Sequence, residues 1–314
     1  MYSVYISDSV NPYFNLAFEE YLVKHHDSED QILFLWRNNN TVVIGKNQNP
    51  WKECNLAALE SMGGNLLRRL SGGGAVYHDL GNLNFTFISP YSDGQIEKNM
   101  RLIIDVLLHN GIDASFSGKN DILVNGCKVS GNAFFAEDDT LCHHGTLLID
   151  SELEKICDIL TVSQNKLKSK GIDSVKSRIK NLKEFNKNIS VEVLKRDLLS
   201  WFLPEPAFVE PATVNEETIL GSGAHFHEIQ DLMKRFESWD WNFGSSPEFN
   251  IQISERFAWG GVEIGIMVQD GTIADLVVET DSLDIDLPQK IKNLLLNKNF
   301  DYDYILSVLN DTQA

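Results

Sequence analysis

Residues 68–79, which read RRLSGGGAVYHD, form the segment of this chain best suited to binding an anion. Three consecutive glycines allow the backbone to approach a ligand closely and to adopt unusual dihedral angles, and the N–H groups of such a loop can surround a negative charge. Arg68 and Arg69 add donors suited to phosphate or carboxylate. The glycine spacing matches neither the P-loop nor the dinucleotide-binding loop. The segment predicts a ligand-binding loop of another kind, although a glycine triplet alone often forms only a flexible turn.

A second segment, residues 117–133 (SGKNDILVNGCKVSGNA), has the pattern of a β-hairpin. Asp121 begins one apolar strand, Asn125 and Gly126 make a turn of the kind that joins two strands, and Lys128 begins the next strand. On such a hairpin Asp121 and Lys128 can lie close together. A carboxylate is suited to Mg²⁺ and a lysine amine to a phosphoryl oxygen. The alternative is an ordinary hairpin that carries an exposed ion pair.

The histidines and cysteines give weaker indications of a functional site. His143 and His144 are adjacent, and neighbours on a strand point to opposite faces, so we expect a core or supporting role rather than a shared metal. No two cysteines form a CxxC pair, so a zinc site is not predicted. In a reducing compartment four free thiols are expected, at Cys54, Cys127, Cys142 and Cys157.

Hydrophobic periodicity predicts the elements that must position these segments. Helices are expected at residues 14–24, 53–62, 96–110, 152–160, 190–202, 287–297 and 302–310. Strands are expected at 31–36, 41–44, 84–88, 122–124, 146–149, 262–268 and 272–278, the last two joined by an Asp270-Gly271 turn. Strands and helices mix without regular alternation, which favours an α+β class. A change of composition near 239–247 predicts two domains, residues 1–245 and 246–314.

Composition and charge exclude several classes of protein. The net charge of −18 argues against general nucleic-acid binding. No apolar run reaches the roughly 20 residues of a membrane span, and the N-terminus lacks the pattern of a signal peptide, so we expect a cytoplasmic protein. Residues 164–200 nevertheless carry ten basic and four acidic residues. This stretch is either a solvated helix face or a positive surface for a phosphate-bearing ligand or an acidic partner.

Taken together, these segments resemble the lipoate-protein ligase A family along nearly the whole chain. The resemblance rests on residues 6–9, 15–17, 33–37, 41–45, 48–55, 68–81, 128–131, 143–148, 174–178, 241–244 and 256–263. It implies a large catalytic domain of the biotin/lipoate-protein ligase type, which is like that of class II synthetases, and a small α+β C-terminal domain.

The resemblance also implies roles for individual residues. ATP would be bound by Arg69, Gly74, Ala75, Val76, Tyr77 and Lys128. Lipoate would be bound by Leu16, Glu19, Arg69, Ser71, Gly72, Gly73, His78 and Lys128. Lys128 is the implied catalytic residue, because it would touch both lipoate and the α-phosphate. Asp121 would lie at the Mg²⁺ site, and residues 176–182 would form a mobile loop that covers the adenylate.

A protein of this family would activate lipoate with ATP and Mg²⁺ to lipoyl-AMP and transfer the lipoyl group to a lysine of an acceptor. The implied acceptors are apo-lipoyl domains of 2-oxoacid dehydrogenase complexes and the glycine cleavage H protein; neither nucleic acid nor membrane is an expected partner. Other readings are an octanoyltransferase of the same fold, which would work without ATP by direct transfer or through a thioester at Cys127 or Cys142, a biotin ligase, and a non-catalytic lipoate-binding protein.

Overall fold

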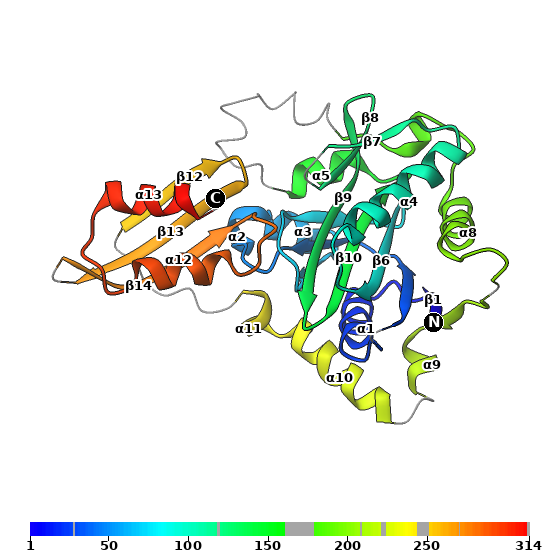
Figure 1. Ribbon diagram of the computed structural model, residues 1–314, viewed down its shortest axis with the longest axis horizontal. Helices are drawn as coiled ribbons and strands as arrows, with labels where there is room; N and C mark the ends of the chain where they lie inside the picture. The colour runs from blue at the N-terminus through cyan, green and yellow to red at the C-terminus, as the bar shows by residue number, and fades with distance from the viewer. Residues whose placement is uncertain are drawn as a thin grey trace.

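The computed structural model describes residues 1–27, 29–117, 120–160, 179–207, 209–220, 224–243, 251–269 and 271–312. Within these ranges the chain forms three β-sheets. Two of them lie in a larger body built from the N-terminal three quarters of the chain, and the third belongs to the C-terminal part, drawn in orange and red in Figure 1. Parallel and antiparallel strands occur together with packed helices, so the predicted α+β class is confirmed.

The largest sheet has eight strands in the order β11-β1-β2-β6-β10-β9-β8-β7. Its members are β1 (Tyr2–Ser7), β2 (Gln31–Trp36), β6 (Asn82–Pro90), β7 (Ala114–Phe116), β8 (Asp121–Val124), β9 (Cys127–Glu137), β10 (Thr140–Leu148) and β11 (Ala212–Val214). Strand β1 runs parallel to both β11 and β2, whereas the pairs from β2 to β7 are antiparallel. The three longest strands of this sheet, β6, β10 and β9, are therefore neighbours.

Helices cover both faces of the large sheet. Those of the larger body are α1 (Pro12–Lys24), α2 (Pro50–Glu53), α3 (Leu56–Ser61), α4 (Gln95–His109), α5 (Leu153–Ile159), α8 (Val191–Phe202), α9 (Glu216–Leu220), α10 (Ala224–Glu237), α11 (Trp239–Asn242) and the 3₁₀ turn η1 (Leu182–Glu184). Along β2, Leu33 and Leu35 face the core under α4 and α8, while Phe34 and Trp36 face the core under α1 and α10. This alternation is the two-residue period of a strand buried on both faces.

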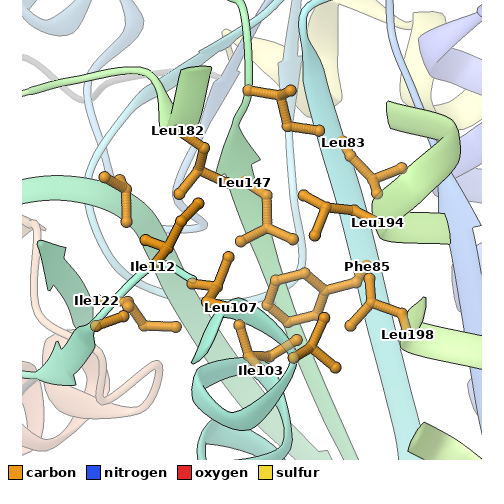
Figure 2. Close-up of a cluster of buried hydrophobic side chains, with 14 of the residues drawn as sticks. Leu83, Phe85, Ile103, Leu107, Ile112, Ile122, Leu147, Leu182, Leu194 and Leu198 are labelled. Atoms are coloured by element: carbon orange, nitrogen blue, oxygen red, sulfur yellow. The ribbon is translucent and has the colours of Figure 1, made fainter. Parts of the chain in front are cut away.

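The core under α4 and α8 is shown in Figure 2. Phe85 of β6 and Leu147 of β10 meet Leu107 of α4 and Leu198 of α8, and all four side chains are 0% exposed. Burial of a leucine or phenylalanine stabilises the fold by about 1.5–3 kcal/mol for each side chain. This core therefore fixes β6 and β10, whose other faces carry polar side chains.

The small sheet of the larger body carries the glycine loop. Its strands lie in the order β4-β3-β5, and they are β3 (Thr41–Ile44), β4 (Asn65–Arg68) and β5 (Val76–His78). Strand β4 is parallel to β3 and β5 is antiparallel to it. Residues 69–75, the glycine loop, lead from β4 to β5 and cross the end of β3, where Arg69 donates its backbone N–H to the carbonyl of Ile44 at 3.0 Å.

The C-terminal part is an antiparallel sheet with two helices on it. Its elements are β12 (Ile251–Phe257), β13 (Gly260–Gln269), β14 (Thr272–Thr280), α12 (Leu287–Leu295) and α13 (Tyr302–Asp311). It has a core of its own, in which Ile264, Leu287 and Ile305 are 0% exposed. The predicted domain division at 245/246 and residue 270 of the predicted turn fall outside the described residues, so the division stays a prediction.

Prediction and structure agree best for buried strands. The strands expected at 31–36 and 41–44 coincide with β2 and β3. The single helix expected at 53–62 is wrong, because the chain forms α2 and α3 with a break between them. Cys54 pairs there with Leu160, and the Asn55 side chain accepts a hydrogen bond from the N–H of Ala58 and so begins a new helix.

Candidate active site

The glycine loop is held closely against the backbone that follows β3. Lys46 donates its N–H to the carbonyl of Ser71 at 2.9 Å. A Cβ atom at Gly45 would clash with the carbonyl oxygen of Gly73, so this approach of two backbones requires glycine. Gly73 itself has φ +87°, in the left-handed region that other residues rarely adopt. The loop is thus a defined structure rather than a flexible turn.

Arg69 shapes this loop from inside. Its guanidinium donates to the Ser71 hydroxyl at 2.9 Å and to the carbonyl oxygens of Val43, Gly72 and Gly74 at 3.1, 2.6 and 2.8 Å. The side chain is 6% exposed. Burial lowers the pKa of Arg69 to about 10, and the nearby carboxylate of Glu19 acts in the opposite direction. Most donors of Arg69 are therefore used to hold the loop.

Arg68 is not available to a ligand, so its prediction as a ligand donor is wrong. Its guanidinium donates to backbone carbonyls on two sides, namely those of Gly45, Lys46, Gln48, Trp241 and Asn242. Because these acceptors come from the turn after β3 and from α11, Arg68 joins the small sheet to α11. Arginine offers five donors in a rigid fork, which suits this multiple contact as well as it suits phosphate.

A chain of buried hydrogen bonds runs from the loop into the large sheet. The Ser71 hydroxyl contacts Nε2 of His144 at 2.7 Å, and Nδ1 of His144 contacts both carboxylate oxygens of Glu19 at 3.0 Å. Glu19 also accepts from the Thr86 hydroxyl at 2.5 Å, which in turn accepts from the Trp36 indole at 3.0 Å. The chain connects α1, β2, β6 and β10 with the glycine loop.

The order serine, histidine, glutamate is that of a nucleophilic triad, but the environment differs from one. Ser71 is 0% exposed, and its hydroxyl already accepts from Arg69. A nucleophile must reach its substrate. Ser71, His144 and Glu19 therefore hold the loop in place rather than form a nucleophilic triad, and the lipoate contacts of Ser71 and Glu19 stay predictions.

The predicted hairpin brings Asp121 and Lys128 together. Asn125 and Gly126 have φ +49° and +77°, the conformation of a two-residue hairpin turn. The Lys128 amine lies 2.7 Å from Oδ1 of Asp121, and both side chains are about one third exposed, at 32% and 31%. A Cβ atom at Gly131 would lie 3.0 Å from that amine, so the lysine packs directly over this glycine.

A cavity lies between the glycine loop and the middle of the large sheet. Its lining consists of Leu16, Trp36, Val43, Arg69, Gly74, Ala75, Val76, His78, Asn84, Asn120, Lys128, Gly131, Asn132, Ala133, His144, Gly145 and Thr146. Seven of these residues were predicted as site residues from the sequence: Leu16, Arg69, Gly74, Ala75, Val76, His78 and Lys128. The structure therefore brings the loop segment and the lysine of the hairpin to one cavity.

Other predicted site residues lie beside this cavity. Glu19 and Ser71 stand behind its wall and contact His144, and Asp121 reaches it through the Lys128 ion pair. The Tyr77 side chain is buried with the core of the small sheet and donates to Asn40 at 2.5 Å. Burial raises the pKa of Tyr77 to about 12. Tyr77 does not line the cavity, and its contact with a nucleotide stays a prediction.

Gly72 and Gly73 face the C-terminal part of the chain. Gly73 donates its N–H to the carbonyl of Ser282 at 2.8 Å, and a Cβ atom at Gly72 would clash with the same carbonyl oxygen. Nearby, Thr280 donates its N–H to the carbonyl of Asn47 at 2.8 Å. The segment after β14 thus lies directly on the glycine loop, a contact that the sequence did not predict.

Several polar lining residues were not predicted: Asn84, Asn120, Asn132, His144 and Thr146. For Asn84 the sequence does contain a signal. Asn82, Asn84 and Thr86 alternate with Leu83 and Phe85 along β6, and the structure buries all five. Polar side chains on one face of a strand that is buried on both faces indicate a hydrogen-bonded network or a ligand site.

Two buried histidines are neutral near pH 7. Burial lowers the pKa of His78 to about 3, with smaller contributions from the charges of Arg69 and His144. Burial likewise lowers the pKa of His143 to about 3, again with His144 contributing. His143 points away from His144, as expected for neighbours on a strand, and contacts Oδ1 of Asn132 at 3.1 Å.

The described cysteine side chains are free thiols, at Cys54, Cys127 and Cys142; that of Cys157 lies outside the described side chains. Glu19, Cys142 and His144 lie close enough together to suggest a metal site, but Glu19 and His144 already bond to each other. Across the described ranges, every helix is too short or too polar to cross a membrane.

The predicted loop at 176–182 is described only from Ile179 onward. Ile179 pairs with Lys128, and Lys180 donates its backbone N–H to the carbonyl of Lys128 at 3.0 Å. Leu182 is 0% exposed. The end of the predicted loop is therefore anchored beside the candidate catalytic lysine, while residues 176–178 and the motif at 174–178 lie outside the described residues.

Comparison with known proteins identifies the family. Residues 11–203 match the family described as lipoyl protein ligase A/B catalytic domain, and residues 246–314 match the bacterial lipoate protein ligase C-terminus. Lipoate-protein ligase A of Psychrobacter cryohalolentis is 41% identical over 294 residues, which cover 93% of this chain and 86% of that protein.

Solved structures agree with this assignment. P. falciparum LipL1 in complex with lipoate has a TM-score of 0.82 and 31% identity, over 98% of this chain and 93% of that one. A lipoate-protein ligase A bound with ATP shares the fold, with a TM-score of 0.65 and 23% identity over 77% of this chain and 98% of that one. The chain belongs to the lipoate-protein ligase A family, whose catalytic domain and C-terminal part both match it.

Proposed function

We propose that this protein activates lipoate with ATP to lipoyl-AMP and then transfers the lipoyl group to a lysine of an acceptor protein. The observation that carries the proposal is the cavity with the glycine loop and Arg69 on one wall and the Lys128 amine on another. The lipoate complex of P. falciparum LipL1, a relative with 31% identity, supports lipoate as the acyl substrate. The anion-binding character of the loop supports ATP as the second substrate.

In the first step a lipoate carboxylate oxygen attacks the α-phosphorus of ATP, and pyrophosphate leaves. Two anions must therefore meet, and unit charges 4 Å apart repel by about 4 kcal/mol at an effective dielectric constant of 20. The Lys128 amine and the loop N–H groups offset this repulsion and stabilise the negative charge that develops on the phosphate oxygens. Asp121 orients the amine through its ion pair at 2.7 Å.

Asp121 is also suited to Mg²⁺. Its carboxylate is 31% exposed and stands next to the cavity-lining Asn120, and Mg²⁺ is usually bound through one or two carboxylates together with substrate phosphates and water. Asp121 would hold this ion, which would supply positive charge against the phosphates of ATP. We propose Asp121 as its protein ligand.

In the second step the amine of the acceptor lysine attacks the carbonyl carbon of lipoyl-AMP. An amide bond forms, AMP leaves and the amine loses a proton. Positioning is the main requirement, since the mixed anhydride is already reactive. The anchoring of Lys180 on Lys128 supports residues 176–182 as a segment that shields this intermediate from water.

We propose apo-lipoyl domains of 2-oxoacid dehydrogenase complexes and the glycine cleavage H protein as acceptors. Such acceptors are typically acidic, so the basic stretch at 164–200 is a candidate docking surface. In its described part, however, Lys180, Lys183, Lys195 and Arg196 pair with nearby acidic residues. This pairing favours a solvated face there. Free thiols at the described cysteines suit the proposed cytoplasmic location.

A thioester route to an octanoyltransferase has less support. Cys142 is 0% exposed, and burial together with Glu19 raises the pKa of its thiol well above the usual value. A buried thiol of high pKa is a poor nucleophile. Neither Cys142 nor Cys127 lines the cavity. The Lys128–Asp121 pair and the ordered loop also argue against a protein that only binds lipoate.

The proposed function is tested by mass spectrometry of an apo-lipoyl domain incubated with the protein, lipoate, ATP and Mg²⁺. We expect a mass increase of one lipoyl group on the target lysine, dependent on ATP and insensitive to alkylation of thiols. An unmodified acceptor would contradict the proposal. Acyl transfer that needs a thioester donor instead of ATP would support the octanoyltransferase.

A further inference from the structure

Two Asn-Gly pairs occur in the sequence, Asn110-Gly111 and Asn125-Gly126. An asparagine before glycine is prone to lose its side-chain amide, because no glycine side chain hinders attack by the glycine nitrogen on the asparagine Cγ atom. Both glycines have positive φ, +71° at Gly111 and +77° at Gly126. Sequence and backbone conformation therefore treat the two pairs alike, and their hydrogen bonding distinguishes them.

The pair at Asn110 follows helix α4 and is held at both of its reacting groups. The Asn110 carboxamide donates to the carbonyl of Val106 and to Oδ2 of Asp197, each at 2.9 Å. The N–H of Gly111, which contains the attacking nitrogen, donates to the carbonyl of Leu108 at 2.8 Å. These hydrogen bonds must open before the carboxamide carbon and the nitrogen can meet.

The pair at Asn125 forms the turn between β8 and β9 and lacks these restraints. Asn125 and Gly126 are both exposed. Their neighbours Val124 and Cys127 pair with each other and close the turn. Across the described ranges of the chain, neither the Asn125 carboxamide nor the Gly126 N–H takes part in a hydrogen bond. The two reacting groups can therefore approach each other in the folded protein.

We propose that Asn125 is a site of spontaneous deamidation and that Asn110 is protected from it. The Gly126 nitrogen attacks Cγ of Asn125 and gives up its proton. A new C–N bond forms, the bond from Cγ to Nδ2 breaks, and ammonia leaves. Water then opens the cyclic imide at one of its two carbonyl carbons. One opening gives aspartate, and the other gives isoaspartate, whose backbone runs through the former side chain and is one carbon atom longer.

The modified turn is the one that sets the Lys128–Asp121 ion pair. Lys128 lies opposite Leu123 and Asp121 lies opposite Gly131, and the amine is 2.7 Å from the carboxylate. Loop length and turn type fix the register of a hairpin. Isoaspartate lengthens this loop, so it displaces the Lys128 amine, whereas aspartate only adds a charge. The effect on activity rests on the proposed function; the deamidation itself does not.

Trypsin digestion and mass spectrometry of the full chain, before and after incubation in mildly alkaline buffer, test the site. Cleavage after Arg101, Lys119 and Lys128 places Asn110 and Asn125 on different peptides. We expect the peptide of residues 120–128 to gain the mass of an amide-to-acid conversion at Asn125 and to elute as two products. An unchanged peptide would overturn the proposal.

Asn110 is the internal control for the effect of structure. It should react more slowly than Asn125 by on the order of a hundredfold, because its three hydrogen bonds must open first. In urea, where neither pair is held, the two sites should react at similar rates. Equal rates in the folded protein would show that hydrogen bonding does not protect Asn110 and would overturn the distinction.

Asn125→Gly removes the amide and keeps the turn, since glycine readily adopts the φ of +49° found there. Fresh wild type and this variant should show equal lipoate-dependent exchange of pyrophosphate into ATP. After incubation, exchange by the wild type should fall in proportion to its isoaspartate, while the variant keeps its rate. Fresh Asn125→Asp, which adds the charge alone, should stay within about twofold of wild type. Equal losses in wild type and Asn125→Gly would refute the effect of the turn.

The two proposals fail in different ways. If fresh wild-type protein does not exchange pyrophosphate with lipoate, the proposed function falls, and the peptide masses still decide whether Asn125 deamidates. If exchange persists undiminished in protein that carries isoaspartate at this position, the proposed function stands and the effect of the modified turn on Lys128 is refuted.

Discussion

Buried side chains that line the cavity or stand behind its wall determine the geometry of the glycine loop. His144 contacts Ser71 on the glycine loop and Glu19 on α1, and Arg69 donates to four acceptors of the same loop and its surroundings. In a buried environment such a network is stabilising when each member has its partners and costly when one is removed. The loop geometry therefore depends on buried side chains that hold one another in place.

His144→Phe tests this dependence. The phenyl ring fills the space of the imidazole but leaves Glu19 and Ser71 without their shared partner, so we expect the free energy of unfolding to fall by about 3 kcal/mol. Urea unfolding measures this free energy. His227→Leu, a change of an exposed histidine on α10, is the control and should stay within about 0.5 kcal/mol of wild type. Equal stability of both variants would contradict the supporting role of His144.

Buried neutral histidines predict a dependence of stability on pH. The pKa of both His78 and His143 is about 3 in the folded protein, against about 6.5 in an unfolded chain. Between these values the unfolded chain binds more protons, so the stabilisation present above pH 6.5 is lost progressively as the pH falls toward 3. At pH 5 the loss is about 2 kcal/mol for each histidine.

Urea unfolding at pH 7 and pH 5 checks this dependence. His143→Gln keeps a hydrogen-bonding side chain that cannot be protonated. It should therefore halve, roughly, the part of the stability difference between pH 7 and pH 5 that comes from the two histidines. A variant with the same difference as the wild-type protein would show that His143 does not titrate as described.

Single residues were predictable where spacing alone carries the chemistry. Lys128 and Asp121 follow from the Asn-Gly turn, because that turn places their two strands side by side. In the register Lys128 lies opposite Leu123 and Asp121 opposite Gly131, so the two side chains meet diagonally. Asn84 and His144 come from strands far apart in the sequence, and their meeting depends on the strand order of the sheet. Arg68 was misjudged since the same guanidinium donors suit phosphate and backbone carbonyls.

At the scale of elements, the glycine loop keeps its shape because backbone atoms of neighbouring segments approach it at positions where a Cβ atom would clash. The loop leaves β4, passes over the end of β3 and enters β5, with Gly73 in the left-handed region. Gly74 differs from Gly73, because a Cβ atom there would meet nothing within 4 Å. Alanine substitutions at these two glycines therefore distinguish the effect of an added methyl group from the effect of backbone strain.

Gly73→Ala should destabilise the protein by about 1–3 kcal/mol, because alanine at φ +87° is strained. It should also weaken lipoate binding, since its Cβ atom would lie 3.0 Å from the Arg69 guanidinium. Urea unfolding and calorimetry with lipoate measure both effects. Gly74→Ala, the matched control for stability, should unfold like wild type. Unchanged lipoate affinity in Gly73→Ala would count against the role of the loop.

Buried strands with clear boundaries were predicted best. Strands β2 and β3 are buried runs with clear boundaries, whereas β5, β7 and β11 have three residues each and are too short for periodicity to detect. Helix α10 was missed although Phe226, Ile229, Met233 and Phe236 have helical spacing.

At the scale of the whole molecule, the active-site loop lies between the large sheet and the C-terminal part. The carbonyl of Ser282 accepts from Gly73, and Asn47 contacts both Thr280 and the carbonyl of Ile285. The α+β class followed from the sequence, because strands and helices mix without regular alternation. The contact between the two parts did not, since it joins loops more than 200 residues apart that carry no shared pattern.

The central claim for the molecule is that the cavity brings its two anionic substrates, lipoate and ATP, together at Lys128. The most direct measurement is lipoate-dependent exchange of pyrophosphate into ATP without an acceptor protein, for wild type and Lys128→Ala. We predict that exchange in Lys128→Ala falls by at least a hundredfold, while Lys234→Ala, a change of an exposed lysine on α10, exchanges normally. Near-normal exchange in a folded Lys128→Ala protein would contradict the account.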